Sequence, residues 1–139
     1  MLNIAVLVSG GGTNLQAILD SEARGENPNG RVTLVVASKP GVYALERAAG
    51  AGVESCVVRR RDYAESADFD AALLQVLQAH GIDLVVLAGF LSVLGPAVIR
   101  AYPNRILNVH PALIPSFCGP GMGAPTAVRP GGPARQNGG

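Results

Sequence analysis

The stretch Asn3-Ile4-Ala5-Val6-Leu7-Val8-Ser9-Gly10-Gly11-Gly12-Thr13-Asn14 decides the fold class of this chain. Its first half, residues 3–8, is apolar on both faces, which is typical of a strand buried within a sheet. Its second half is a glycine-rich turn, and residues 15–19 then place apolar side chains at helical spacing. The stretch therefore predicts a strand, a tight turn and a helix at the start of an α/β domain.

The same alternation of apolar strands and amphipathic helices continues along the 139 residues. Further strands are predicted at residues 31–37, 53–58 and 83–88, with a fifth ending at Asn108, and helices at residues 42–51 and 68–80, with a short one from near Pro96. Strands that alternate with helices build a doubly wound, mostly parallel sheet, which is a Rossmann-type α/β fold. The length suits one domain.

The last seventeen residues, 123–139, break this pattern, because five are glycine and three are proline. Such a composition is typical of low-complexity segments, and no helical or strand period runs through it. We therefore expect a domain over residues 1–122, incomplete at its C-terminus, and a disordered tail over residues 123–139.

Composition and charge limit the classes of partner and the cellular location that we expect for this chain. The formal net charge is +1, which gives no reason to expect nucleic acid or an anionic membrane as a partner. No apolar run could span a bilayer and no signal segment is recognisable, so a cytoplasmic location is expected. Cys56 and Cys118 lie in no CxxC pair, which favours two reduced thiols over a disulfide or metal site.

The glycine-rich turn over residues 9–14 is a candidate anion site, because backbone N–H groups at a helix N-terminus favour negative charge. The alternative is a simple tight turn. No lysine follows the glycines, so this is not a Walker loop, and Leu15 stands where a dinucleotide fingerprint needs its last glycine. A small phosphorylated substrate fits better than NAD.

The run Ile106-Leu107-Asn108-Val109-His110-Pro111 places an amide and an imidazole two residues apart at a strand end. Residues i and i+2 of a strand point to the same face, and ligands of open α/β sheets bind beyond the carboxyl ends of strands. An amide donor beside an imidazole suits a reaction in which an oxyanion forms and a proton moves. The alternative is that the two side chains cap a turn.

Two further segments are candidates. Residues 88–94 follow the fourth strand and could wall a flat, ring-like ligand, or could be core leading into a helix. The basic run Arg59-Arg60-Arg61 could bind an anion, although a solvated turn is the simpler interpretation.

Taken together, these motifs resemble the phosphoribosylglycinamide formyltransferases, which are folate-dependent enzymes of purine synthesis. The resemblance runs from Asn3 to about Met122 and is carried by residues 3–10, 12–18, 86–90 and 107–115. Methionyl-tRNA formyltransferases share the Asn-x-His core but are less similar in the glycine-rich turn. A non-catalytic module that keeps only nucleotide-phosphate binding is a third interpretation.

The resemblance implies roles for individual residues. Gly12, Thr13 and Asn14 would hold the phosphate of glycinamide ribonucleotide. Asn108 would donate to the formyl oxygen as it becomes an oxyanion, and His110 would be the proton donor. The substrate amine is the nucleophile, so no nucleophilic side chain and no metal are implied.

The resemblance also implies that Leu91, Ser92, Val93 and Leu94, with Asn108, line the site of the co-substrate 10-formyltetrahydrofolate. The family has a basic folate contact before its third helix, whereas the aligned region here is 65–67 and offers no such residue.

A second departure follows Met122. The family supplies an Asp there that raises the pKa of the catalytic His, whereas the last acidic residue of this chain is Asp83. The composition of the tail is what GC-rich DNA tends to encode when it is read out of frame. We therefore expect an N-terminal part of such an enzyme, with poor formyl transfer on its own.

Overall fold

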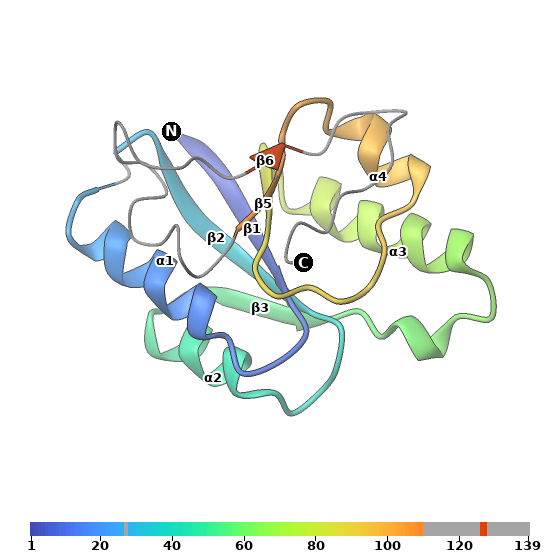
Figure 1. Ribbon diagram of the computed structural model, residues 1–139, viewed down its shortest axis with the longest axis horizontal. Helices are drawn as coiled ribbons and strands as arrows, with labels where there is room; N and C mark the ends of the chain where they lie inside the picture. The colour runs from blue at the N-terminus through green and yellow to red at the C-terminus, as the bar shows by residue number, and fades with distance from the viewer. Residues whose placement is uncertain (27, 110–125, 128–139) are drawn as a thin grey trace.

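The computed structural model describes residues 1–26, 28–109 and 126–127. Strands and helices alternate along the chain, as Figure 1 shows. The elements are β1 (Leu2–Val8), α1 (Thr13–Ala23), β2 (Gly30–Ala37), α2 (Tyr43–Gly50), β3 (Glu54–Val57), the 3₁₀ turn η1 (Arg60–Asp62), α3 (Ser66–Ala79), β4 (Leu84–Leu87), α4 (Pro96–Ala101), β5 (Ile106–Asn108) and β6 (Thr126–Ala127).

The strands form one sheet in the order β3-β2-β1-β4-β5-β6. Every pairing from β3 to β5 is parallel. The chain runs from β1 outward to β3 and then returns to β4 on the other side of β1. This reversal places the loops after β1 and β4 side by side at the carboxyl edge, which is where open α/β sheets bind ligands.

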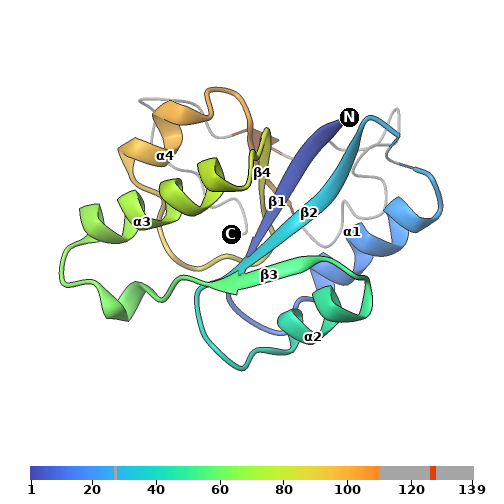
Figure 2. The same cartoon turned by 180° about the vertical axis from the view of Figure 1, so that it is seen from behind.

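Helices cover both faces of the sheet, with α1 and α2 on one face and α3 and α4 on the other (Figures 1 and 2). Successive side chains of β1 point to opposite faces of the sheet and so contribute to both hydrophobic cores. Ala5 and Leu7 belong to the core on the α3 face, whereas Val6 and Val8 belong to the core on the α1 face. Each fully buried Leu, Val or Phe side chain contributes about 1.5–3 kcal/mol.

The predicted strands and helices up to Asn108 are confirmed, with ends that differ by up to a few residues. The doubly wound α/β fold is confirmed as well. The first helix begins at Thr13 rather than Leu15, because Gly12 in the left-handed conformation already turns the chain into the helix.

The tail departs from its prediction at two residues. No strand was expected in it, yet Thr126–Ala127 forms β6, antiparallel to β5. The outer edge of β5 carries backbone donors and acceptors that pair with any extended segment, and such pairing requires no apolar period in the sequence. The other tail residues lie outside the described part of the chain.

Candidate functional site

The glycine-rich turn and the start of the loop after β4 enclose one small pocket at the carboxyl edge of the sheet. Its volume is about 160 Å³, and it is lined by Gly10, Gly11, Gly12, Thr13, Asn14, Ala88 and Gly89. All of the residues predicted to hold a phosphate therefore line the pocket, and one of them, Thr13, is the first residue of α1. Backbone N–H groups at a helix N-terminus favour an anion, so the pocket suits a phosphate group.

Gly12 is the residue that shapes this turn. Its φ of +81° is strained for any residue with a side chain, and a Cβ built there would lie 2.7 Å from the Cβ of Ala44 on α2. The N-terminus of α1 therefore packs directly against α2 only because position 12 is glycine.

Arg47 on α2 holds the turn from outside the pocket. Its Nε donates to the carbonyl oxygen of Gly11 at 2.8 Å, and one terminal nitrogen donates to Oε1 of Gln16 at 3.2 Å. The guanidinium carbon lies 4.8 Å from the ring centroid of Tyr43, within the range of a cation–π contact. Sequence analysis missed Arg47, because its partner Gly11 is distant along the chain and offers only a carbonyl group.

Ser9 connects three loops at the carboxyl edge. Its hydroxyl lies 2.8 Å from that of Ser38, which follows β2, and it accepts a hydrogen bond from the N–H of Leu91 at 2.8 Å. Both serines are buried. The hydroxyl therefore fixes the loop after β4 against the glycine-rich turn.

Asp70 on α3 fixes the other end of the loop that follows β4. Its carboxylate accepts hydrogen bonds from the N–H groups of Gly95 at 3.0 Å and Ala97 at 2.8 Å, which places it at the N-terminus of α4. Only 3% of Asp70 is exposed, and a Cβ at position 95 would lie 2.6 Å from its carboxylate. Asp70 is a second residue that sequence analysis missed.

The four residues predicted to line a folate site lie on this doubly anchored loop, but in different environments. Leu91 and Val93 are 79% and 68% exposed, whereas Leu94 is buried in the core against α3 and α4. Exposed apolar side chains next to a pocket can cover a flat ring. Leu94 instead anchors the loop.

Asn108 ends β5 beside the same loop. It is buried and pairs in register with Leu87, which pairs in turn with Leu7. Asn108 therefore lies at the same height along the strands as the end of β1, where the glycine-rich turn begins. It is on β5, the strand next to β4. His110 lies outside the described residues.

The basic run after β3 is held largely by local contacts. Arg59 lies 3.6 Å from the carboxylate of Asp62, and Arg60 donates to the carbonyl oxygen of Tyr63 at 2.8 Å. Neither lines the pocket at the glycine-rich turn. These contacts favour the interpretation of the run as a structured turn.

The sequence analysis also made predictions about the cysteines, metal sites and membrane-spanning segments. Cys56 is a free thiol on β3 whose pKa is raised by burial and by the charge of Glu54, and Cys118 lies outside the described residues. Within the described ranges, no three metal-ligating side chains are grouped together. No helix in those ranges is long and apolar enough to cross a membrane.

Comparison with known proteins places the chain among formyl transferases. The formyl transferase family model matches residues 2–129, which extends beyond the boundary predicted at residue 122. The phosphoribosylglycinamide formyltransferase of Haemophilus influenzae is 38% identical over 119 residues, covering 86% of this chain and 56% of the relative. The trifunctional purine biosynthetic protein adenosine-3 of Drosophila melanogaster is 42% identical over 119 residues, which cover 84% of this chain and 9% of that protein.

Solved structures agree with these relatives. Glycinamide ribonucleotide transformylase 1 from Symbiobacterium toebii superimposes with a TM-score of 0.75 at 49% identity, covering 84% of this chain and 55% of that one. Glycinamide ribonucleotide transformylase 1 from Geobacillus kaustophilus superimposes with a TM-score of 0.75 at 41% identity, covering 87% of this chain and 64% of that one. The chain thus spans about half the length of the Haemophilus and Symbiobacterium proteins. Because the family model matches nearly all of its residues, the chain belongs to the formyl transferase family.

Proposed function

We propose that this chain is the N-terminal part of a phosphoribosylglycinamide formyltransferase, which transfers a formyl group from 10-formyltetrahydrofolate to the amine of glycinamide ribonucleotide in purine synthesis. Both partners are small molecules, and the expected location is the cytoplasm. The observation that carries the proposal is the pocket that the glycine-rich turn and the loop after β4 form together, with Asn108 at the same edge of the sheet.

The phosphate of the ribonucleotide would bind at Gly12, Thr13 and Asn14. These residues begin α1, and Gly12 gives the turn the backbone conformation that opens it toward the pocket. Arg47 adds support, because it engages the Gly11 carbonyl oxygen in a hydrogen bond. A carbonyl oxygen turned into the pocket would repel a phosphate, whereas the N–H groups attract it.

The folate would lie over the loop of residues 88–95. Ser9 and Asp70 hold the two ends of this loop, so its backbone can be presented in one conformation before the co-substrate binds. Leu91 and Val93 supply exposed apolar surface there. A preformed loop costs less ordering entropy on binding than a mobile one.

The reaction requires one oxyanion donor and one proton donor. The ribonucleotide amine attacks the formyl carbon, the formyl oxygen gains negative charge, and the bond to the folate nitrogen then breaks as that nitrogen gains a proton and the new amide nitrogen loses one. Asn108 would donate to the oxygen, because a fixed amide donor stabilises such charge most where water is excluded. His110 would supply the proton.

The proposal is tested by formyl transfer in a chain completed with the C-terminal half of a relative. Asn108→Ala should lower turnover by roughly 100- to 1000-fold, as expected for the loss of one oxyanion donor. Asn29→Ala, at an exposed position in the turn before β2 and outside the lining of the pocket, is the control and should retain turnover. Near-normal turnover with Asn108→Ala would assign Asn108 a structural role.

The alternative of a module that only binds phosphate predicts a different result. Such a module would bind glycinamide ribonucleotide at the glycine-rich turn, but its completed form would transfer no formyl group. Binding and transfer measured on the same completed protein therefore distinguish the two interpretations.

A further inference from the structure

Arg47 on α2 is fixed beside the glycine-rich turn by contacts on several sides. Its Nε donates to the carbonyl oxygen of Gly11 at 2.8 Å, and its guanidinium carbon lies 4.8 Å from the ring centroid of Tyr43. A terminal nitrogen donates to Oε1 of Gln16 at 3.2 Å. The Gln16 amide is oriented in turn, because its nitrogen donates to the carboxylate of Asp20 at 2.9 Å. The guanidinium is therefore held in one place before any ligand binds.

The contact with Gly11 determines which way one peptide group of the turn points. In a trans peptide the C=O and the following N–H point in opposite directions. Because the Gly11 carbonyl oxygen is turned toward Arg47, the N–H of Gly12 points away from Arg47. The pocket is on that other side of the turn, because α2 connects β2 to β3, whereas Ala88 and Gly89 of the pocket follow β4, across β1 from β2.

The peptide group between Gly11 and Gly12 needs this support, because glycines flank it on both sides. Its rotation by half a turn changes only ψ of Gly11 and φ of Gly12, and glycine adopts φ values of either sign. After such a rotation the Gly11 carbonyl oxygen would face the pocket and repel an anion, and the N–H of Gly12 would face Arg47. The hydrogen bond from Arg47 therefore favours the orientation that presents the N–H.

The donors and the charge at this turn are not matched by acceptors of the protein. Among the described residues, none accepts a hydrogen bond from the backbone N–H groups of Gly10, Gly11 or Gly12. No carboxylate in the described part of the chain forms an ion pair with Arg47. Its positive charge therefore adds to that of the N-terminus of α1, and a bound anion would complement both.

We propose that Arg47 is a positioning residue for the substrate phosphate, because it keeps the peptide between Gly11 and Gly12 in the orientation that presents the Gly12 N–H to the anion. Arg47 is not among the residues that line the pocket, so it acts through Gly11 and not by contact with the ligand. The proposal rests on the phosphate site proposed at the glycine-rich turn, and it does not depend on formyl transfer.

The test measures the binding of inorganic phosphate and of glycinamide ribonucleotide to the full ¹⁵N-labelled chain, from the amide signals of Gly12, Thr13 and Asn14. Arg47→Ala should raise both dissociation constants by about tenfold, the effect of lowering the population of the competent orientation to about one tenth. Without ligand, the Gly12 signal should move or broaden, because its peptide group then exchanges between two orientations. Added methylguanidinium should restore part of the affinity, which a general loss of stability would not allow.

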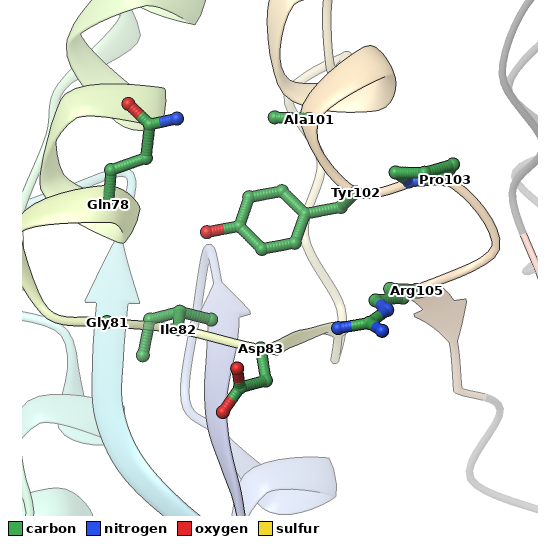
Figure 3. Close-up of a pocket in the computed structure, with 8 residues that line it drawn as sticks. All are labelled: Gln78, Gly81, Ile82, Asp83, Ala101, Tyr102, Pro103 and Arg105. Carbon is green, nitrogen blue, oxygen red and sulfur yellow. The ribbon is translucent and has the colours of Figure 1, made fainter.

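Arg105→Ala is the matched control, because it removes the same charge at the opposite edge of the sheet. Arg105 is exposed and lies just before β5, as Figure 3 shows. This variant should bind phosphate as the unmodified chain does. A dispersed amide spectrum verifies that each variant is folded, and Arg47→Gln replaces Arg47→Ala if the latter is not. Unchanged binding in the folded Arg47 variant, or equal weakening in the Arg105 variant, would overturn the proposal.

Failure of this proposal is distinguishable from failure of the proposed function. If the Arg47 variant binds inorganic phosphate more weakly and the completed chain transfers no formyl group, the role of Arg47 stands and the proposed function fails. If the completed chain transfers formyl groups and the Arg47 variant binds both ligands normally, only the role of Arg47 fails. If neither ligand shifts the signals of the turn in the unmodified chain, the phosphate site and the role of Arg47 are overturned together.

Discussion

The hydroxyl of Ser9 accepts a hydrogen bond from the backbone N–H of Leu91 at 2.8 Å. This one contact joins the turn proposed to hold a phosphate to the loop proposed to hold a folate. Ser9 follows β1 directly, and Leu91 follows β4, which pairs with β1 in the sheet. The parallel order of the strands therefore brings together two loops that are far apart in the sequence, and the serine sets their separation.

Ser9→Ala should lower the free energy of unfolding by about 1–3 kcal/mol, because it leaves the N–H of Leu91 and the hydroxyl of Ser38 without their partner in a buried site. Chemical denaturation measures the change. Ser55→Ala, at an exposed position of β3, is the control and should change stability by less than about 0.5 kcal/mol. Equal effects of the two substitutions would show that the Ser9 contact does not stabilise the edge.

Gly12→Ala should destabilise the chain by roughly 1–3 kcal/mol and weaken phosphate binding. The new Cβ meets Ala44 at 2.7 Å, and the residue must keep a positive φ. Gly10→Ala changes the same turn where a Cβ meets no atom within 4 Å, so it should preserve stability. Thermal unfolding of the two variants in parallel measures the difference, and a Gly12 variant as stable as the Gly10 variant would refute the packing argument.

Asp70→Asn should lower the free energy of unfolding by about 1–3 kcal/mol and loosen the loop after β4. An amide has a single acceptor oxygen, so it cannot satisfy the N–H groups of both Gly95 and Ala97 as the carboxylate does. Asp68→Asn, exposed in the first turn of the same helix, should cost only a few tenths of a kcal/mol. Hydrogen exchange at Gly95 and Ala97 should accelerate in the first variant alone; protection unchanged there would count against the role of Asp70.

His80 should make stability depend on pH. Its ring contacts the Val76 carbonyl and the Glu54 carboxylate, each at 2.8 Å, and these contacts raise its pKa above 6.5. Protonation is therefore favoured in the folded state, so the stabilisation is complete below the unfolded pKa and is lost as the pH rises through the higher folded pKa.

The size of the His80 effect is limited by exposure, because Glu54 is mostly exposed and the pair is screened by salt. We expect roughly 0.2–1 kcal/mol. Urea unfolding at about pH 5.5 and pH 8.5 should show that His80→Gln costs stability at the lower pH and less at the higher one. A loss of stability in His80→Gln that is larger at pH 8.5 than at pH 5.5 would contradict this prediction.

The sequence predicted the strands, the helices and the glycine-rich turn because these depend on local patterns. Apolar runs identify β1, β2 and β4, and the consecutive glycines mark the turn whatever surrounds it. Asn108 could be assigned to the carboxyl edge because its strand ends in a proline-containing segment.

The supports of the site could not be predicted, because they depend on pairs that only the fold brings together. Arg47 on α2 donates to Gly11 in the turn before α1, and Asp70 on α3 accepts from Gly95 just before α4. A signal for Asp70 existed: it lies beside Phe69 on a helix whose other buried positions are apolar, and an acid on such a face requires partners. The two-residue strand β6 carried no comparable signal.

The most direct measurement is a titration of the ¹⁵N-labelled chain with glycinamide ribonucleotide. The account predicts that the backbone amide signals of Gly11, Gly12, Thr13, Asn14 and Gly89 shift together and saturate with one dissociation constant, because these residues share one pocket. Shifts confined to Arg59–Arg61, or to residues 81–83 and 102–105 at the opposite edge of the sheet, with the glycine-rich turn unchanged, would contradict the central claim that the carboxyl edge is the substrate site.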